Sequence, residues 1–420
     1  MDDPSRSASR YEPFDPSYTR GLVEQVLRPM IEDYFRSRIF GAHRLPDRGP
    51  LILAANHSGN DFPYDGMVLD ALLWMRDGLR PERKIRTLYE TELSSRWWMR
   101  PFGIDNLWRT AGGVDVTFDN FERLVARGDR VAYFPEGVPG IGKGFRRRYQ
   151  LQKFRTSFVV IAARHRVPVY PVYVVNGEWN LPFNFTLRPL NWIMQKLFHV
   201  PFLPLPAAPL GMAFPWAWYL TLPARMMYVV GEPIDVRSLV EAEGITDFER
   251  PDRAKMRRVA ERIRVRMQRE LDRQVRHYGR RPYQWRSLLR SLREARRRGR
   301  LTRALPIGWT VHFVRFHRDR HRPAARGRLH AALRDWDLLG FYLPFGWPLL
   351  SLTRALRRPP YGYRGLTTDE RRKREGRFLW RLAEHPLPPR DAVERGERER
   401  LLSVRRAAIP ADSGFGARPG

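Results

Sequence analysis

The chain has 420 residues, of which 43% are hydrophobic and 12% aromatic. This length is enough for two or three domains, and the apolar fraction is enough for a substantial core. The sequence contains no cysteine, which excludes disulfide bonds, thiolate nucleophiles and cysteine-bound zinc. The lack of cysteine also fits a reducing compartment.

The composition is strongly basic, with 76 Lys and Arg residues against 45 Asp and Glu residues and a net charge of +31. Such a charge attracts polyanions, including anionic lipid headgroups, nucleic acid and phosphorylated ligands. The first residues are polar and form no apolar run, so we expect no signal peptide. Residues 1–20 are predicted to be disordered.

Short apolar runs alternate with helical patterns along residues 21–278. The predicted strands are Leu51–Ala55, Val131–Phe134, Val167–Val175 and Met226–Val230. The predicted helices cover residues 22–34, 65–74, 121–125, 158–164 and 252–277. This alternation is typical of an α/β fold with a mostly parallel central sheet flanked by helices. We therefore expect residues 21–278 to form one domain.

The composition changes after residue 278. Residues 281–330 are crowded with arginine, and Leu338–Leu352 is an uncharged segment rich in aromatic residues. We predict a basic, mainly helical extension over residues 279–385. The last residues, 386–420, are polar and contain proline and glycine, so we expect a disordered tail.

A second uncharged segment lies between Lys196 and Arg225, apart from His199 when it is protonated. A spanning helix needs about 20 consecutive apolar residues, but six prolines interrupt this segment, and each costs about 3 kcal/mol inside a helix. We expect a broken apolar hairpin that either packs on the domain or lies in a bilayer interface, where aromatic rings gather.

The most informative residue is His57, which lies two residues after the predicted strand Leu51–Ala55. Asp61 and Asp65 follow it by four and eight residues. A histidine with a nearby carboxylate is the arrangement of a general base and the group that orients it. The alternative is that these residues only cap the following helix.

A second motif, Phe134-Pro135-Glu136-Gly137, ends the next strand. Together with Asn56-His57 and the Val-Pro strand Val167–Val172, it resembles the glycerolipid acyltransferases of the lysophosphatidate type, over about residues 35–275. The stretch Glu136–Phe154 is similar to a divergent branch related to mono- and diacylglycerol acyltransferases. The resemblance implies transfer of a fatty acyl group to a glycerol or lysophospholipid hydroxyl. The acyl donor would be acyl-CoA or acyl-carrier protein as a co-substrate, and no cofactor is expected.

The resemblance assigns His57 as the base that removes the hydroxyl proton. In the common family pattern the aspartate lies five residues after the histidine, but position 62 is Phe. Pro63-Tyr64-Asp65-Gly66 is similar to the motif of the divergent branch lengthened by one residue, which favours Asp65 over Asp61 as the partner. Backbone N–H groups after Gly59 would hold the oxyanion.

Further residues are assigned to substrates by the same resemblance. Arg109 would hold an acceptor phosphate, although an alignment on Gly112–Val114 places Phe118 at that position and implies an acceptor without phosphate. Glu136, with Gly137, would bind acceptor hydroxyls or brace the loop. Apart from the resemblance, Lys143 and Arg148 follow on a glycine-rich loop, from which they would meet the phosphates of the acyl donor.

Two further patterns in the sequence resemble a nucleotide phosphate-binding loop and a metal site. Gly137–Lys143 matches the first seven positions of the phosphate-binding loop Gly-x4-Gly-Lys-Ser/Thr, but position 144 is Gly, so the hydroxyl that binds Mg²⁺ is missing. His317 and His321 lie one turn apart without a third metal ligand, so we expect no metal site.

The alternative to an enzyme is a degenerate acyltransferase fold that binds a membrane or nucleic acid through its basic residues. No nucleic-acid-binding motif is present, so nucleic acid is the less favoured partner. We expect a peripheral or monotopic protein on the cytoplasmic face of an anionic membrane, with residues 198–223 and 338–352 on the bilayer.

Overall fold

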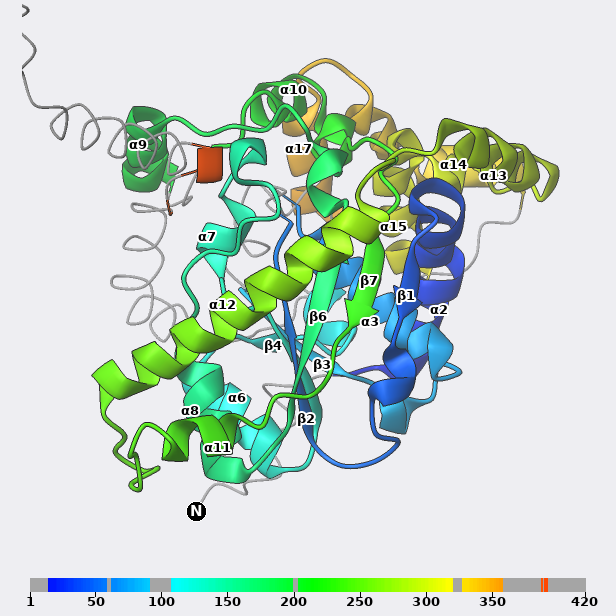
Figure 1. Ribbon diagram of the computed structural model, residues 1–420. Helices are drawn as coiled ribbons and strands as arrows, with labels where there is room; N and C mark the ends of the chain where they lie inside the picture. The colour runs from blue at the N-terminus through cyan, green and yellow to red at the C-terminus, as the bar shows by residue number, and fades with distance from the viewer. Residues whose placement is uncertain are drawn as a thin grey trace, which may run out of the picture.

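The computed structural model describes residues 14–58, 62–90, 107–198, 203–319, 327–357, 387 and 389–391. Among these residues, a seven-stranded sheet has the order β1-β7-β6-β2-β5-β3-β4 (Figure 1). The strands are β1 (Arg38–Phe40), β2 (Leu51–Ala55), β3 (Arg86–Tyr89), β4 (Val114–Asp115), β5 (Arg130–Tyr133), β6 (Val169–Val175) and β7 (Met227–Val230). All neighbouring strands are parallel except β6 and β7. The predicted mostly parallel α/β fold is therefore confirmed.

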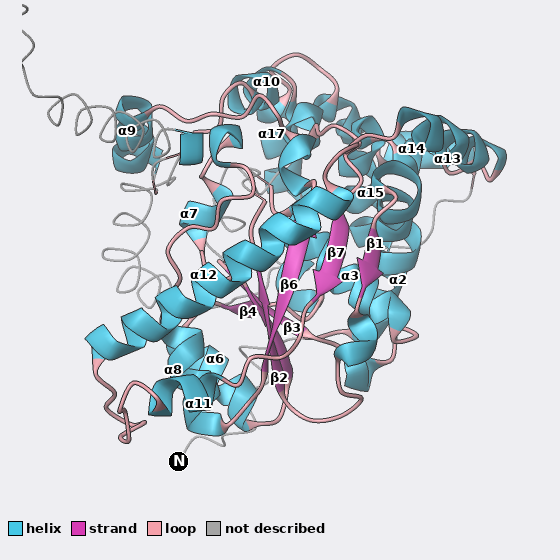
Figure 2. Cartoon of the chain, in the orientation of Figure 1, coloured by secondary structure: helices cyan, strands magenta, loops and turns pink. Residues whose placement is uncertain are grey.

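Both faces of the sheet are covered by helices (Figure 2). Alternate residues of β2 consequently contribute to two different cores: Leu51, Leu53 and Ala55 to one, Ile52 and Ala54 to the other, because successive strand residues point to opposite faces. The first core is lined by α2 (Pro16–Leu22), the π-helical turns η1 (Val23–Leu27) and η2 (Met30–Phe35), and α3 (Tyr64–Arg76). The second is lined by α6 (Phe118–Ala126), α8 (Ser157–His165), α11 (Val236–Glu241) and α12 (Arg253–Tyr278).

All four predicted strands are present, as β2, β5, β6 and β7. The pattern missed β1, β3 and β4, which have three, four and two residues. β1 has no buried residue and β3 is buried at every second position, so neither forms the continuous apolar run that marks a central parallel strand. The predicted N-terminal helix begins earlier than expected, at Pro16.

The start of α2 lies within the residues predicted to be disordered. Asp15 caps the helix by accepting the Tyr18 N–H at 2.8 Å. The Tyr18 ring is buried, and its hydroxyl is 2.7 Å from Nδ1 of His317. This contact ties the N-terminal helix to the C-terminal extension, and it gives His317 a structural role.

The described part of the extension is mainly helical. Its elements are α13 (Trp285–Arg297), α14 (Leu301–Ala304), α15 (Pro306–Asp319), α16 (Arg328–Arg334), the 3-10 turn η9 (Trp336–Phe341) and α17 (Trp347–Arg357). Helix α15 enters the first core through Trp309, which is fully buried. Its ring lies 5.3 Å from Tyr34, 5.6 Å from Phe35 and 5.7 Å from Tyr64 between centroids. The extension and the sheet therefore share one core.

The described part of the proline-interrupted segment forms two short pieces, α10 (Ala207–Ala213) and the 3-10 turn η8 (Pro215–Tyr219). Within the described ranges, no helix combines the length and apolarity needed to cross a bilayer. Tyr219 is buried, whereas Met212 is 61% exposed. The segment thus packs on the domain along one side and exposes apolar side chains on the other.

The shared core generates a stability prediction. Trp309→Ala should lower the free energy of unfolding by about 3–5 kcal/mol, as expected for removal of a buried ring. Because α15 shares the core of the sheet, the whole chain should unfold in one transition at a lower temperature, measured by calorimetry. Ile307→Ala, at a 48% exposed position on the same helix, is the control. A change confined to a separate, minor transition would contradict the shared core.

Candidate active site

The carboxyl end of β2 carries the candidate site. Asn56, the residue after the strand, is fully buried and bonds to the backbone of Val174 on β6: its Oδ1 accepts the N–H at 2.7 Å, and its Nδ2 donates to the carbonyl at 3.1 Å. The two hydrogen bonds of this side chain continue the contact between β2 and β6 beyond the last paired residue of β2. They fix the backbone position of the next residue, His57.

His57 pairs with Asp65, the second residue of α3. Nδ1 of His57 lies 3.0 Å from Oδ2 of Asp65, and both side chains are buried. The same oxygen accepts the Ser58 N–H at 2.8 Å and the Ser58 hydroxyl at 3.2 Å, and Oδ1 accepts the Gly66 N–H at 2.7 Å. Asp65, the partner favoured by the sequence, is thus in contact with His57, while Asp61 lies outside the described residues.

Two opposing effects act on the Asp65 carboxyl. Burial raises its pKa, but the positive charge that His57 can carry and the hydrogen bonds from His57, Ser58 and Gly66 outweigh burial and lower the pKa below the usual Asp value. Asp65 is therefore a carboxylate near neutral pH and accepts the proton on Nδ1 of His57. This places the lone pair of neutral His57 on Nε2, the nitrogen needed for a base.

The His57 ring is also fixed by packing. Phe134, which follows β5, stacks on it with ring centroids 4.2 Å apart and an interplanar angle of 14°. Since β5 neighbours β2 in the sheet, the aromatic residue of the Phe-Pro-Glu-Gly motif lies beside the histidine of the Asn-His motif. The two motifs are one structural unit.

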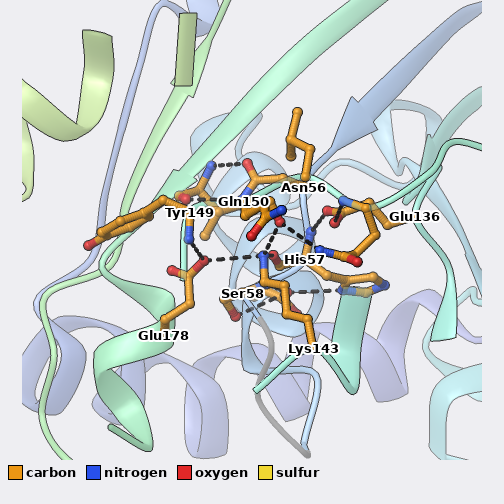
Figure 3. Close-up of polar contacts among 12 residues, drawn as sticks. Asn56, His57, Ser58, Glu136, Lys143, Tyr149, Gln150 and Glu178 are labelled. Atoms are coloured by element: carbon orange, nitrogen blue, oxygen red, sulfur yellow. Dashed lines mark hydrogen bonds and ion pairs between the residues drawn. The ribbon is translucent and has the colours of Figure 1, made fainter. Parts of the chain in front are cut away.

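The backbone of His57 is held on both sides (Figure 3). Oε1 of Glu136 accepts the His57 N–H at 2.9 Å, and Oε2 accepts the Gln152 N–H at 2.7 Å. Nζ of Lys143 donates to the His57 carbonyl at 2.7 Å. Glu136 and Lys143 are both 1% exposed. Of the two roles considered for Glu136, its geometry corresponds to bracing the loop.

Glycines allow this close packing. Gly137 has φ +59° and ψ −149°, a backbone conformation that is essentially restricted to glycine. Gly140, in α7 (Val138–Ile141), is needed for space: a Cβ there would lie 2.7 Å from Cβ of Glu136 and 2.9 Å from Cβ of His57. Gly177 lies against Ser58 in the same way, since its Cβ would be 2.4 Å from Cβ of Ser58.

The other predicted substrate residues lie in different surroundings. Arg109, on α5 (Leu107–Thr110), is buried and pairs with Asp115 at 3.0 Å. Arg148 is exposed, with its guanidinium 4.9 Å from the centroid of the Phe145 ring. Arg148 can therefore meet a ligand from solvent. Lys143 cannot meet such a ligand, because its ammonium points inward to the His57 carbonyl. The same orientation argues against a phosphate-binding loop at residues 137–143.

The residues that sequence reasoning missed are Ser58, Gly140 and Glu178. Glu178 lies in η7 (Gly177–Asn180), directly after β6, the neighbour of β2. The parallel pairing was the available signal, because parallel strands that are neighbours end at the same edge of a sheet. In the part of the chain that the structure describes, no group of three or more His, Cys, Asp or Glu residues is placed to hold a metal ion.

Residues 36–175 match the family model described as Acyltransferase. The segment that carries the predicted motifs is therefore similar to the acyltransferase family, which confirms the resemblance predicted from those motifs. The matched segment runs from the residues before β1 to the end of β6 and contains His57, Asp65 and Glu136. Gly177 and Glu178 follow it in the chain.

Curated relatives come from mycobacteria. An uncharacterized protein of Mycobacterium tuberculosis is 29% identical over 251 residues, which cover 58% of this chain and 65% of that protein. An uncharacterized protein of Mycobacterium leprae is 32% identical over 223 residues, or 53% of this chain and 57% of that protein. The chain thus spans less than two thirds of the length of these relatives.

A solved structure is also similar, the 1-acyl-sn-glycerophosphate (LPA) acyltransferase PlsC from Thermotoga maritima. It is 17% identical, with a TM-score of 0.34, and the similarity covers 64% of this chain and 84% of that chain. A likeness at this TM-score carries no argument about fold or function. The similarity to the acyltransferase family rests on the family model and on the motifs that form the site.

The packing of Gly140 can be tested directly. Gly140→Ala should push Glu136 and His57 apart and lower the free energy of unfolding by about 1–3 kcal/mol, the usual cost of overpacking. Thermal unfolding and a crystal structure of the variant would measure both effects. Gly137→Ala, where no atom lies within 4 Å of the added Cβ, should destabilise through backbone strain alone. An unmoved His57 in Gly140→Ala would contradict the packing argument.

Proposed function

We propose that the chain is an O-acyltransferase that moves a fatty acyl group from an acyl thioester to a glycerolipid hydroxyl, in phospholipid or glycerolipid biosynthesis. The observation that carries the proposal is the buried His57–Asp65 pair within the segment that matches the acyltransferase family. The pair supplies a neutral imidazole with a free Nε2, which is what deprotonation of an alcohol requires.

The reaction follows from this geometry. Nε2 of His57 removes the proton of the acceptor hydroxyl while the hydroxyl oxygen forms a bond to the thioester carbonyl carbon. Asp65 stabilises the imidazolium that results. The tetrahedral oxyanion then collapses, the C–S bond breaks, and the imidazolium returns its proton to the departing thiolate. No covalent acyl-enzyme forms, so a nucleophilic side chain is not needed.

The donor and acceptor ends of the site are also part of the proposal. Arg148 is exposed on the same loop as Arg146 and Lys153, and these cations would bind the phosphates of acyl-CoA or of an acyl-carrier protein. An acceptor phosphate would have to compete with Asp115 for Arg109. Phe118, at the alternative position, is 40% exposed. Both observations favour an acceptor without phosphate, such as mono- or diacylglycerol.

Two substitutions test the proposed base. His57→Ala should abolish acyl transfer, and Asp65→Asn should lower kcat by about 10²–10⁴-fold because the tautomer of His57 is no longer fixed. Labelled acyl-CoA would be presented with glycerol-3-phosphate, lysophosphatidate, monoacylglycerol and diacylglycerol in turn. Circular dichroism would establish that both variants fold. Full activity of folded His57→Ala would overturn the mechanism.

A surface at the same end of the sheet supports membrane binding. The Phe345 N–H donates to the Ala213 carbonyl at 2.7 Å, and Trp347 donates to the carbonyl of Gly211 at 3.1 Å. These bonds join the two uncharged segments predicted to contact a bilayer. Figure 1 shows α9 (Arg188–Phe198), α10 and α17 along one side of the molecule. Many apolar side chains of residues 183–212 and 339–352 are exposed. We term the following set the apolar face: Phe183, Phe185, Trp192, Ile193, Leu210, Met212, Leu339, Leu343, Phe345 and Leu352.

The apolar face favours lipid over the non-catalytic alternatives. Trp192 is 55% exposed, with the Lys196 ammonium 4.1 Å from its ring centroid, an arrangement suited to the interface of an anionic bilayer. Binding of a duplex nucleic acid would depend on exposed cations that contact phosphates, and it would leave these apolar side chains in water. The paired His57 and Asp65 also favour an active enzyme over a degenerate fold. We place the protein on the cytoplasmic face of a membrane.

Serine substitutions test this orientation. The triple variant Trp192→Ser, Met212→Ser and Phe345→Ser should bind vesicles that contain anionic lipid about tenfold or more weakly, because it removes three large apolar side chains from the interface. Phe118→Ser, which removes an exposed ring from α6, is the control and should bind as the unsubstituted protein does. Cosedimentation at constant salt measures the difference. Equal binding of the triple variant and the control would reject the apolar face as the contact.

A further inference from the structure

We propose that the buried Lys143–Glu178 ion pair is a positioning device that holds the backbone of the base, rather than a contact for the acyl donor. The inference rests on the proposed role of His57 and assigns a function to Glu178, which neither the motifs nor the family model single out. It also gives Lys143 a role other than the phosphate contact that its glycine-rich loop suggested.

The first step concerns the backbone of His57. The pairing of β2 with β6 ends at Ala55 and Val172, so the strand ladder does not reach the catalytic residue. Its two peptide groups are held by side chains: Glu136 accepts the N–H at 2.9 Å, and Lys143 donates to the carbonyl at 2.7 Å. The backbone of His57 is therefore held by one anionic side chain, Glu136, and one cationic side chain, Lys143 (Figure 3).

The second step concerns the surroundings of the ammonium group. Nζ of Lys143 lies 2.7 Å from the carbonyl of His57, 3.4 Å from the carbonyl of Gln150 and 3.3 Å from Oε1 of Glu178. A lysine ammonium has three donors, and three acceptors surround it here. The side chain is 0% exposed, so no donor is left for a phosphate.

The third step concerns Glu178. Its side chain is 1% exposed, and Oε1 also accepts the Tyr149 N–H at 2.9 Å. Burial raises the pKa of Glu178 above its usual value, and the Lys143 ammonium and the Tyr149 N–H offset only part of this rise. A buried ammonium is tolerated only with such a partner. Gly177 packs directly on Ser58, so the turn that carries Glu178 is held against the residue after His57.

These contacts connect three strand ends. Lys143 lies on the loop after β5, Glu178 on the turn after β6, and His57 two residues after β2. Loss of the ammonium would release the His57 carbonyl and shift the imidazole relative to the acceptor hydroxyl. A displacement of about 1 Å at a catalytic group can cost about 10²-fold in rate. The loss should therefore appear in kcat.

The test compares two substitutions with different donors. Lys143→Met removes both the charge and the hydrogen-bond donor, whereas Lys143→Gln keeps an N–H that can bond to the carbonyl. We expect kcat to fall about 10²-fold in Lys143→Met and about tenfold in Lys143→Gln, with the KM for acyl-CoA little changed. Arg148→Met is the matched control on the same loop, and it should raise the KM for acyl-CoA while kcat is retained.

Stability needs a second variant, because Lys143→Met leaves the Glu178 carboxyl buried without its cation. Adding Glu178→Gln removes that charge and keeps an acceptor for the Tyr149 N–H. The double variant should melt at a higher temperature than Lys143→Met but show the same low kcat. Recovery of kcat together with stability would overturn the proposal, because it would mean that the pair serves only the fold.

A readout independent of activity separates this inference from the proposed function. Hydrogen–deuterium exchange of a peptide that spans residues 51–58 reports on the His57 amide. Exchange should be faster in Lys143→Met and in the double variant, and unchanged in Arg148→Met. Unchanged exchange in the Lys143 variants, or equal KM increases in Lys143→Met and Lys143→Gln, would overturn the positioning role. If the unsubstituted protein transfers no acyl group, the proposed function fails, and the exchange result alone then tests whether Lys143 holds the His57 backbone.

Discussion

The hydrogen bond between Nδ1 of His57 and Asp65 is the interaction on which the site depends. It joins the end of β2 to the first turn of α3 and determines which imidazole nitrogen is free. The surrounding contacts serve this bond: Phe134 restricts the ring, and Glu136 and Lys143 hold the peptide groups on either side of it. Gly140 and Gly177 leave space for this packing, because a Cβ at either position would overlap the residues around His57.

The fold was predictable where burial is continuous. The β2, β5 and β6 strands are buried at every residue, and such apolar runs identify central parallel strands. The β1 and β4 strands, with three and two residues, are too short to produce a pattern. The entry of Trp309 into the first core was also not predictable, because a composition change at residue 278 indicates a boundary but not where the later helices pack.

The site was predictable to the extent that motifs place residues at strand ends. His57 and its partner Asp65 followed from the position of the apolar run and from the Pro-Tyr-Asp-Gly sequence. The role of Lys143 did not follow, because a lysine in a glycine-rich loop is normally solvated, and its burial depends on Glu178 thirty-five residues later in the chain. Sequence spacing cannot report that the ends of β5 and β6 meet around β2.

The proposed base, His57, and the apolar face lie at the same end of the sheet, so an acceptor dissolved in a bilayer would approach the site from the membrane side. The proposed mechanism requires one particular tautomer of His57. Selective ¹⁵N labelling of histidine, with the His57 signals assigned by substitution, measures this tautomer by NMR. We predict that neutral His57 carries its proton on Nδ1, with an unprotonated Nε2. A proton on Nε2 at neutral pH would contradict the account, because that nitrogen could then not act as the base.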